Sequence, residues 1–260
     1  GVHNGLLLRC QISTIYAFHD EPTELALMLD YHMGQIASSN KCILSTFGWS
    51  EQQIKTRLSS LQDHISINST PKGTWISYDK SALGPAEEIH LKNVLSPVLF
   101  AEYESTLEQV VSQKLIENQE TLSLAESCTG GKLSSWISSR SGASRYFLES
   151  TVVYSNATKK RVCGVLQSDL DLFGAVSRPV AISLAKGIQK VANSSWGVGI
   201  TGIAGPMGGS DEKPVGTVHI AVSGKFAVKH QKYLFNGHRN EITDRAASAA
   251  LFMLFKALCD

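Results

Sequence analysis

Residues 122–131 read LSLAESCTGG, and this stretch decides how the chain is expected to fold. Its apolar run predicts a strand, and the two glycines before a helical pattern predict a tight turn that opens a helix. Such a turn presents the hydroxyl of Ser127 beside the unpaired N–H groups of the first helical turn, from about Thr129 to Gly131. Ser127 is therefore a candidate nucleophile. The alternative is that the serine and the threonine only cap the helix.

A second cluster, VVYSNATK at residues 152–159, supplies candidates for proton transfer. A serine hydrolase without a histidine base needs another group to accept the hydroxyl proton. A lysine whose charged form is disfavoured by burial can accept that proton near neutral pH, and a tyrosine can relay it. We therefore predict Lys159 as the base and Tyr154 as its partner. The alternative is a solvated lysine on a helix face and a half-buried aromatic on a strand.

A glycine-rich segment, GVGITGIAGPMGG at residues 197–209, follows an apolar strand pattern. Its closely spaced glycines leave backbone N–H groups free to surround an anion such as a phosphate. The spacing matches neither the dinucleotide fingerprint nor the Walker loop. The segment is therefore a candidate phosphate loop, and the alternative is a set of turns.

Six segments occur in the order and spacing of one protein family: LSLAESCTGG, SGASRYF at residues 141–147, VVYSNATK, GAVS at residues 174–177, TGIAGPMGG and KPVGTVHIA. Through them, residues 105–259 resemble the CinA C-terminal domain family. The resemblance implies a nicotinamide mononucleotide deamidase. Such an amidohydrolase releases ammonia from the nicotinamide carboxamide and yields nicotinic acid mononucleotide, here through a serine acyl-enzyme.

The resemblance also implies the residues of the site. It assigns catalysis to Ser127, Tyr154 and Lys159, with no metal and no cofactor. It assigns substrate binding to residues of the turn, the glycine-rich segment and their neighbours: Glu126, Thr129, Gly130, Gly131, Asn156, Ser177, Thr201, Gly202, Ala204, Gly205 and Arg239.

The end of the chain departs from the family pattern. The family usually has an acid before the arginine that corresponds to Arg239, and a second arginine four positions after it. This chain has His238 and Thr243 at those positions. The departure leaves the exact substrate open, and Arg245 is a candidate substitute in space.

Three residues have a second interpretation. Glu126 either compensates a cationic pyridinium ring or binds the backbone of the turn. Cys128 is a competing nucleophile if a helix N-terminus activates its thiolate. Arg239 either binds phosphate or pairs with an acid on its own helix, Glu241 or Asp244.

Composition limits the partners. The 260 residues carry 24 basic and 23 acidic side chains, which provides no field that favours nucleic acid or an anionic membrane. We expect a small-molecule nucleotide substrate and a homo-oligomer, with no nucleic-acid or membrane partner.

No apolar run approaches the roughly 20 residues of a spanning helix, and the first residues lack signal-peptide features. The five cysteines lack zinc-site spacing, which favours a cytoplasmic location.

The chain divides into three expected parts. Residues 1–38 resemble the end of a larger N-terminal domain or a linker, with a strand and helix over residues 14–32. The acids and histidine there, His19, Asp20, Glu21 and Glu24, fit a solvated helix start better than a metal site. Residues 39–100 alternate as a small α+β unit that resembles a KH-like domain, with strands at 42–47, 65–68 and 74–78 and a helix at 50–61. The negative charge of Glu51 disfavours contact with nucleic-acid phosphates, so we expect this unit to have a structural role.

Residues 101–260 are expected to form a layered α/β domain with a mixed sheet. Helices are predicted at 103–116, after the 127–131 turn, and at 157–163, 179–192 and 239–258, with an antiparallel hairpin over 217–234. The apolar stripe of the last helix, Leu251, Met253, Leu254 and Leu258, is core or a subunit interface.

Two rival functions remain: another amidase or esterase, and a catalytically silent nucleotide-binding or competence-related interaction protein.

Overall fold

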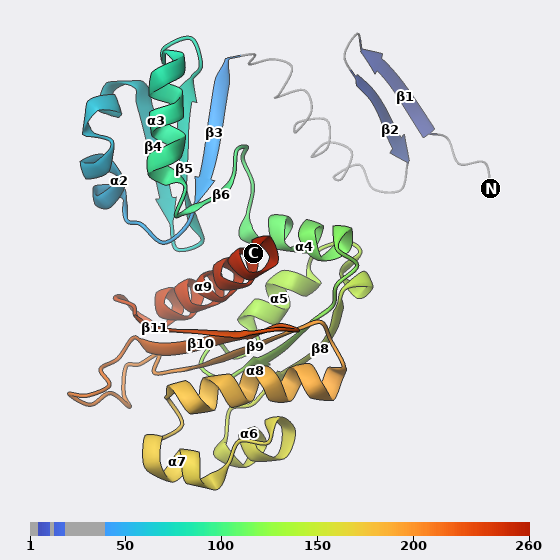
Figure 1. The fold of residues 1–260 in the computed structure, drawn as a ribbon, viewed down its shortest axis with the longest axis vertical. Coiled ribbons are helices and arrows are strands. Elements are labelled where there is room, and N and C mark those ends of the chain that lie inside the picture. The colour runs from blue at the N-terminus through green and yellow to red at the C-terminus, as the bar shows by residue number, and fades with distance from the viewer. Residues whose placement is uncertain (1–4, 11–12, 19–39) are drawn as a thin grey trace.

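The structure is a computed structural model that describes residues 5–10, 13–18 and 40–260 (Figure 1). Near the N-terminus, β1 (Gly5–Cys10) and β2 (Ser13–Phe18) pair as an antiparallel hairpin. The β2 strand confirms the strand expected from residue 14. The helix expected after it, and the cluster of His19, Asp20, Glu21 and Glu24, lie outside the described residues.

A small antiparallel sheet follows, with strand order β4-β5-β3-β6. Its elements in chain order are β3 (Lys41–Thr46), α2 (Glu51–Arg57), a 3-10 helix (Ser59–His64), β4 (Ile65–Thr70), β5 (Gly73–Asp79), α3 (Pro85–Leu95) and β6 (Leu99–Ala101). Leu44, Ile54, Ile76 and Leu91 are in its separate hydrophobic core. The α+β composition is confirmed, while a KH-like fold and the exact domain boundaries stay predictions.

The ends of α2 show which local signals decided it. Ser50 and Gln53 form the predicted capping box, because Gln53 N–H donates to Ser50 Oγ and Ser50 N–H donates to Gln53 Oε1. The expected helix to residue 61 is too long, since Leu58 leaves helical geometry and the chain continues as a 3-10 turn. The α3 helix and the β6 strand were not predicted.

The second sheet has five strands in the order β11-β10-β9-β7-β8. Its central strand pairs are parallel: β7 (Leu122–Glu126) with β8 (Phe147–Val152), and β7 with β9 (Trp196–Gly202). The β9, β10 (Thr217–Ser223) and β11 (Val228–Leu234) strands pair antiparallel. The predicted mixed sheet and its antiparallel hairpin are therefore confirmed.

Helices cover both faces of this sheet (Figure 1). One face carries α9 (Arg239–Cys259), with α4 (Leu107–Glu117) and α5 (Lys132–Ser138) packed against it. The other face carries α8 (Arg178–Ala192), which α6 (Asn156–Cys163) and α7 (Gln167–Phe173) contact. Leu251, Met253 and Leu254 are buried in the core under α9, so most of the apolar stripe is core.

Close contact between α8 and β9 depends on Gly199. A Cβ atom built there would lie 2.5 Å from both Ala181 O and Ala185 N. Only glycine leaves room for the helix at that distance. The first half of α8 is thereby fixed beside the middle of β9.

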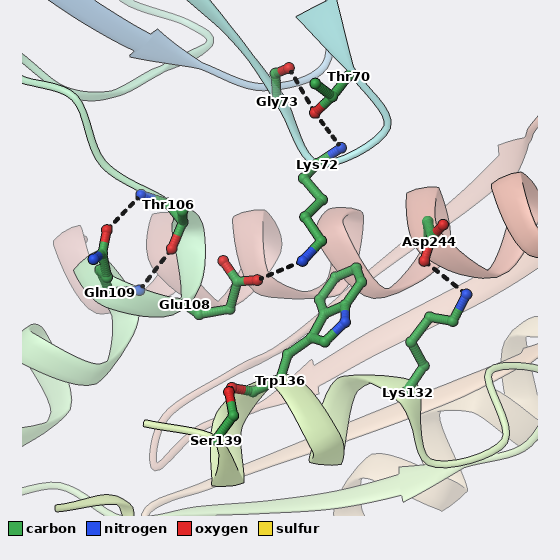
Figure 2. A network of polar contacts seen from close by, with 10 residues as sticks. All are labelled: Thr70, Lys72, Gly73, Thr106, Glu108, Gln109, Lys132, Trp136, Ser139 and Asp244. Atoms are coloured by element: carbon green, nitrogen blue, oxygen red, sulfur yellow. Dashed lines mark hydrogen bonds and ion pairs between the residues drawn. The ribbon is translucent and has the colours of Figure 1, made fainter. Parts of the chain in front are cut away.

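The small sheet contacts the second domain through aromatic and charged side chains. Phe47 lies 5.5 Å from Phe252 on α9, measured between ring centroids. Lys72, in the turn between β4 and β5, points toward Glu108 of α4 and lies 4.3 Å above the Trp136 ring of α5 (Figure 2). The two parts therefore meet through specific contacts, in addition to the chain connection.

Several boundaries in the second domain differ from the expected ones. The α4 helix begins at Leu107 because Thr106 caps it. Thr106 N–H donates to Gln109 Oε1, and Gln109 N–H donates to Thr106 Oγ1. The β8 strand ends at Val152, so Tyr154 lies after the strand and not on it. The α7 helix was not predicted.

Within the described residues, no helix is both long and apolar enough to cross a membrane. Cys42, Cys128, Cys163 and Cys259 are free thiols.

Candidate active site

Ser127 lies in the turn that links β7 to α5. Its N–H donates to Ile200 O of β9 over 3.0 Å, and its carbonyl accepts from Gly130 N–H over 3.1 Å. Gly131, with φ of 95°, is in the left-handed region, which favours glycine there. The α5 helix consequently starts at Lys132, later than expected, and the serine sits at the end of the sheet with 8% of its surface exposed.

Lys159 of α6 reaches the same point and is 2% exposed. Its Nζ lies 3.0 Å from Ser127 Oγ, 2.8 Å from Val153 O and 3.0 Å from Tyr154 O. Parallel pairing explains this meeting, because Glu126 of β7 lies opposite Val152 of β8 and the two strands end together. A solvated lysine is excluded.

Burial lowers the pKa of Lys159 below its ordinary value. The lysine has no ion-pair partner among the described carboxylates. Both carbonyl contacts can only accept, so they bind two N–H groups. A neutral amine then has its lone pair left for the Ser127 hydroxyl, which is the geometry a general base requires.

Backbone donors lie next to the serine. The hydrogen bonds of the turn use the N–H groups of Ser127, Gly130 and Lys132. Within the described residues, the N–H groups of Cys128, Thr129 and Gly131 donate to no backbone carbonyl. The Thr129 hydroxyl is also buried without a hydrogen-bond partner. Of these residues, Cys128 lines the cavity next to Ser127, so its N–H is the donor available to a developing oxyanion.

A cavity of about 270 Å³ opens onto the two reactive side chains. Nine predicted site residues line it: Ser127, Tyr154, Asn156, Lys159, Thr201, Gly202, Ala204, Gly205 and Arg239. Five do not: Glu126, Thr129, Gly130, Gly131 and Ser177. Sequence reasoning missed Cys128, Ala175, Val176, Ile203, Met207 and Gly208 as lining residues. Several of these lie inside the quoted GAVS and TGIAGPMGG segments.

Arg239, the first residue of α9, points into this cavity. Its Nη1 donates to Gly205 O over 2.6 Å and its Nη2 donates to the Tyr154 hydroxyl over 3.0 Å. The pairing with Glu241 or Asp244 is wrong: Glu241 caps His238 N–H, and Asp244 pairs with Lys132. The guanidinium is held in place by neutral groups, and its charge remains available to an anion.

Tyr154 contacts both Lys159 and Arg239. Its carbonyl binds Lys159, while its hydroxyl binds Arg239. Since Lys159 contacts Ser127 directly, proton transfer between them needs no relay. A catalytic role for the phenol stays a prediction.

Glu126 is completely buried behind the turn. Its carboxylate accepts from Leu133 N–H over 3.1 Å, and from both the N–H and the hydroxyl of Ser134. Carboxylates are favoured at helix N-termini. The structure thus favours the backbone-binding interpretation of Glu126 over contact with a pyridinium ring.

Thr201 and Ser177 both bind the loop before α8. Thr201 Oγ1 donates to Ala175 O over 2.8 Å, and Ser177 Oγ donates to Gly174 O over 2.8 Å. Thr201 lines the cavity, whereas Ser177 is turned to its own loop. Ser177 therefore binds the loop that carries the lining residues Ala175 and Val176.

The structure also decides between the alternatives for Cys128 and Arg245. Burial raises the pKa of the Cys128 thiol to about 12, which leaves it protonated and a poor competitor near neutral pH. Arg245 donates to Asn236 O and lines a different cavity, so it is no substitute for the missing arginine at position 243. Within the described residues, no group of three or more histidine, cysteine or acidic side chains is arranged for a metal.

The sequence profile of the CinA C-terminal domain matches residues 104–258. The chain belongs to this CinA family. A CinA-like protein of Syntrophotalea carbinolica is 36% identical over 241 residues, which are 86% of this chain and 57% of that protein. A putative competence-damage inducible protein of Clostridium beijerinckii is 44% identical over 174 residues, 67% of this chain and 42% of that protein.

A solved structure shares the fold of the CinA domain. It is the competence/damage inducible protein CihA from Agrobacterium tumefaciens, which is 36% identical with a TM-score of 0.56. The match covers 59% of this chain and 96% of that one. The chain spans only 39% to 57% of the length of the CinA-like relatives from Endomicrobium trichonymphae and Syntrophotalea carbinolica.

Proposed function

We propose that the CinA domain hydrolyses the carboxamide of nicotinamide mononucleotide to ammonia and nicotinic acid mononucleotide. The observation that carries this proposal is the 3.0 Å contact between Lys159 Nζ and Ser127 Oγ at the floor of a cavity. Acyl transfer requires an activated nucleophile and hydrogen-bond donors for the oxyanion, and Ser127 with the adjacent backbone N–H can provide both. The family resemblance supplies the substrate.

The reaction has two halves. In the first, Ser127 Oγ attacks the amide carbon while Lys159 takes the hydroxyl proton, and the Cys128 N–H stabilises the oxyanion. Lys159 then protonates the leaving nitrogen, the C–N bond breaks, and ammonia departs. In the second, water attacks the ester, its proton passes to Lys159, and the serine leaves with that proton.

The glycine-rich segment and Arg239 are assigned to the phosphate. Gly202, Gly205 and Gly208 bring backbone to the cavity wall, where Arg239 provides the charge. Gly202 cannot be replaced easily, because a Cβ atom there would lie 2.7 Å from Val218 Cγ2. The assignment places the ring near Ser127 and the phosphate toward α9.

The test is a product assay on the purified chain. Ammonia and nicotinic acid mononucleotide are measured after incubation with nicotinamide mononucleotide, with and without a chelator, and beside a panel of other amides. Equal amounts of both products, unaffected by chelator, are expected. Turnover of another amide alone would contradict the substrate, and tight nucleotide binding without turnover would favour the silent binding protein.

A further inference from the structure

A second cavity, of about 500 Å³, lies between the small sheet and the CinA domain. Four aromatic side chains line it: Phe47 and Trp49 from the β3–α2 loop, and Tyr233 and Phe235 at the end of β11. The Tyr233 and Phe235 rings are stacked, with centroids 5.1 Å apart and planes 11° from parallel. Its size and aromatic lining are those of a small-molecule site.

Within the described residues, two charged side chains of this wall form no ion pair: Glu241 and Arg245. Glu51 pairs with Lys55, and the Glu241 carboxylate accepts His238 N–H at the start of α9. Arg245, by contrast, donates only Nη1, to the neutral carbonyl of Asn236, over 2.6 Å; no described carboxylate lies within ion-pair distance of it. The remaining guanidinium N–H groups therefore suit an anion.

We propose that this cavity is a second ligand site, which binds a planar aromatic compound that carries an anionic group. The ring stacks on the aromatic wall and the anion binds Arg245. Aromatic faces favour flat rings of any detailed structure, while the guanidinium selects the phosphate or carboxylate.

The site is connected to the catalytic cavity through a short loop, residues 236–238. Arg245 binds the carbonyl of Asn236, and Glu241 binds the N–H of His238. Gly237, with φ of 115°, lies between them, and Arg239 follows immediately. An anion that binds the remaining N–H groups of Arg245 shifts the guanidinium that also contacts Asn236 O in this loop. Ligand binding at the second site is therefore expected to change the position of Arg239.

The experiment is calorimetric titration of the full chain in an Arg239→Gln background, which weakens phosphate binding in the catalytic cavity. The probes are adenosine 5′-monophosphate and indole-3-acetate, which present a phosphate or a carboxylate, with adenosine and inorganic phosphate as half-probes. At least one anionic aromatic probe is expected to bind more tightly than both half-probes. Adding Arg245→Gln is expected to weaken it by about tenfold or more.

Controls separate the site from a general loss of structure. Arg140→Gln, at an exposed arginine far along the chain, is expected to leave the affinity unchanged. Thermal unfolding reports whether each variant is folded, and Phe235→Leu provides an independent loss of ring stacking. Amide hydrogen exchange over residues 236–239 is expected to change when the probe binds.

Three results would overturn the proposal. They are no binding of either anionic aromatic probe at millimolar concentration, equal affinity in folded Arg245→Gln and Phe235→Leu variants, and unaltered exchange over residues 236–239 at saturation. None of these readouts depends on amidase activity.

Discussion

The chemistry at the residue scale depends on keeping one lysine neutral. Lys159 is buried among carbonyls and one hydroxyl, and no described carboxylate compensates its charge. Desolvation disfavours the ammonium form, so the amine becomes available at a lower pH than for a solvated lysine. The same burial makes the neighbouring thiol of Cys128 less reactive.

The first prediction concerns pH. Below the lowered pKa of Lys159 the nitrogen carries a proton and cannot accept another, so kcat/KM should rise with pH through one ionisation below the ordinary lysine value. Lys159→Arg should be inactive at every pH, since a guanidinium remains protonated. Lys160→Arg, at the exposed neighbour, is the matched control and should keep the profile. Activity in Lys159→Arg would contradict the assignment of the base.

The second prediction concerns the phosphate. Arg239→Gln should raise KM for nicotinamide mononucleotide by about tenfold or more, because a charge-assisted contact is lost, while kcat changes less. Nicotinamide riboside, which lacks the phosphate, should show no such difference between the two proteins. Steady-state kinetics with both substrates measure this. An equal loss with the riboside would show that Arg239 acts on the reacting end.

At the scale of elements, the strand, turn and helix around Ser127 could be predicted because their signals are local. The late start of α5 could not, since it depends on the left-handed geometry of Gly131. The α3 and α7 helices bury few residues, Leu91 and Leu95 in one and Leu170 in the other, and therefore carry a weak apolar pattern.

The third prediction tests the tie between α5 and α9. Lys132 Nζ donates to Asn240 O, Thr243 Oγ1 and Asp244 Oδ1, which fastens the helix after the nucleophile turn to the helix that begins with Arg239 (Figure 2 shows the Asp244 pair). Lys132→Ala should lower the free energy of unfolding by about 1 kcal/mol, because the pair is partly exposed, and should also raise KM. Chemical unfolding and kinetics report the two effects. Lys132→Arg should restore part of KM, and an unchanged KM in Lys132→Ala would argue against a positioning role.

At the scale of the whole molecule, the sequence indicates the parts of the site but not their meeting. Ser127 and Lys159 are each visible as candidates, yet their contact depends on the parallel β7–β8 pairing and on the place of α6 after it. The cavity between the small sheet and the CinA domain is invisible in the sequence for the same reason. Its walls come from segments far apart in the chain.

The fourth prediction measures how firmly the small sheet is coupled to the CinA domain. Phe47 and Phe252 are in tilted contact across the boundary. A double-mutant cycle with Phe47→Ala and Phe252→Ala should give a coupling energy of about 0.5–1.5 kcal/mol, as for other aromatic pairs. Phe226→Ala, at a ring that is 91% exposed, should be additive with either. Strict additivity of the first pair would mean that the contact does not form in solution.

The proposed reaction requires the Ser127 hydroxyl as its nucleophile, and single substitutions at Ser127 and at the adjacent Cys128 distinguish the two candidate nucleophiles. Ammonia release from nicotinamide mononucleotide is measured for the wild type, Ser127→Ala and Cys128→Ala under identical conditions. Ser127→Ala is expected to lose about 100-fold or more of the rate while still binding nucleotide, and Cys128→Ala is expected to stay within a few fold of the wild type. Near-normal ammonia release by Ser127→Ala would contradict the assignment of the nucleophile.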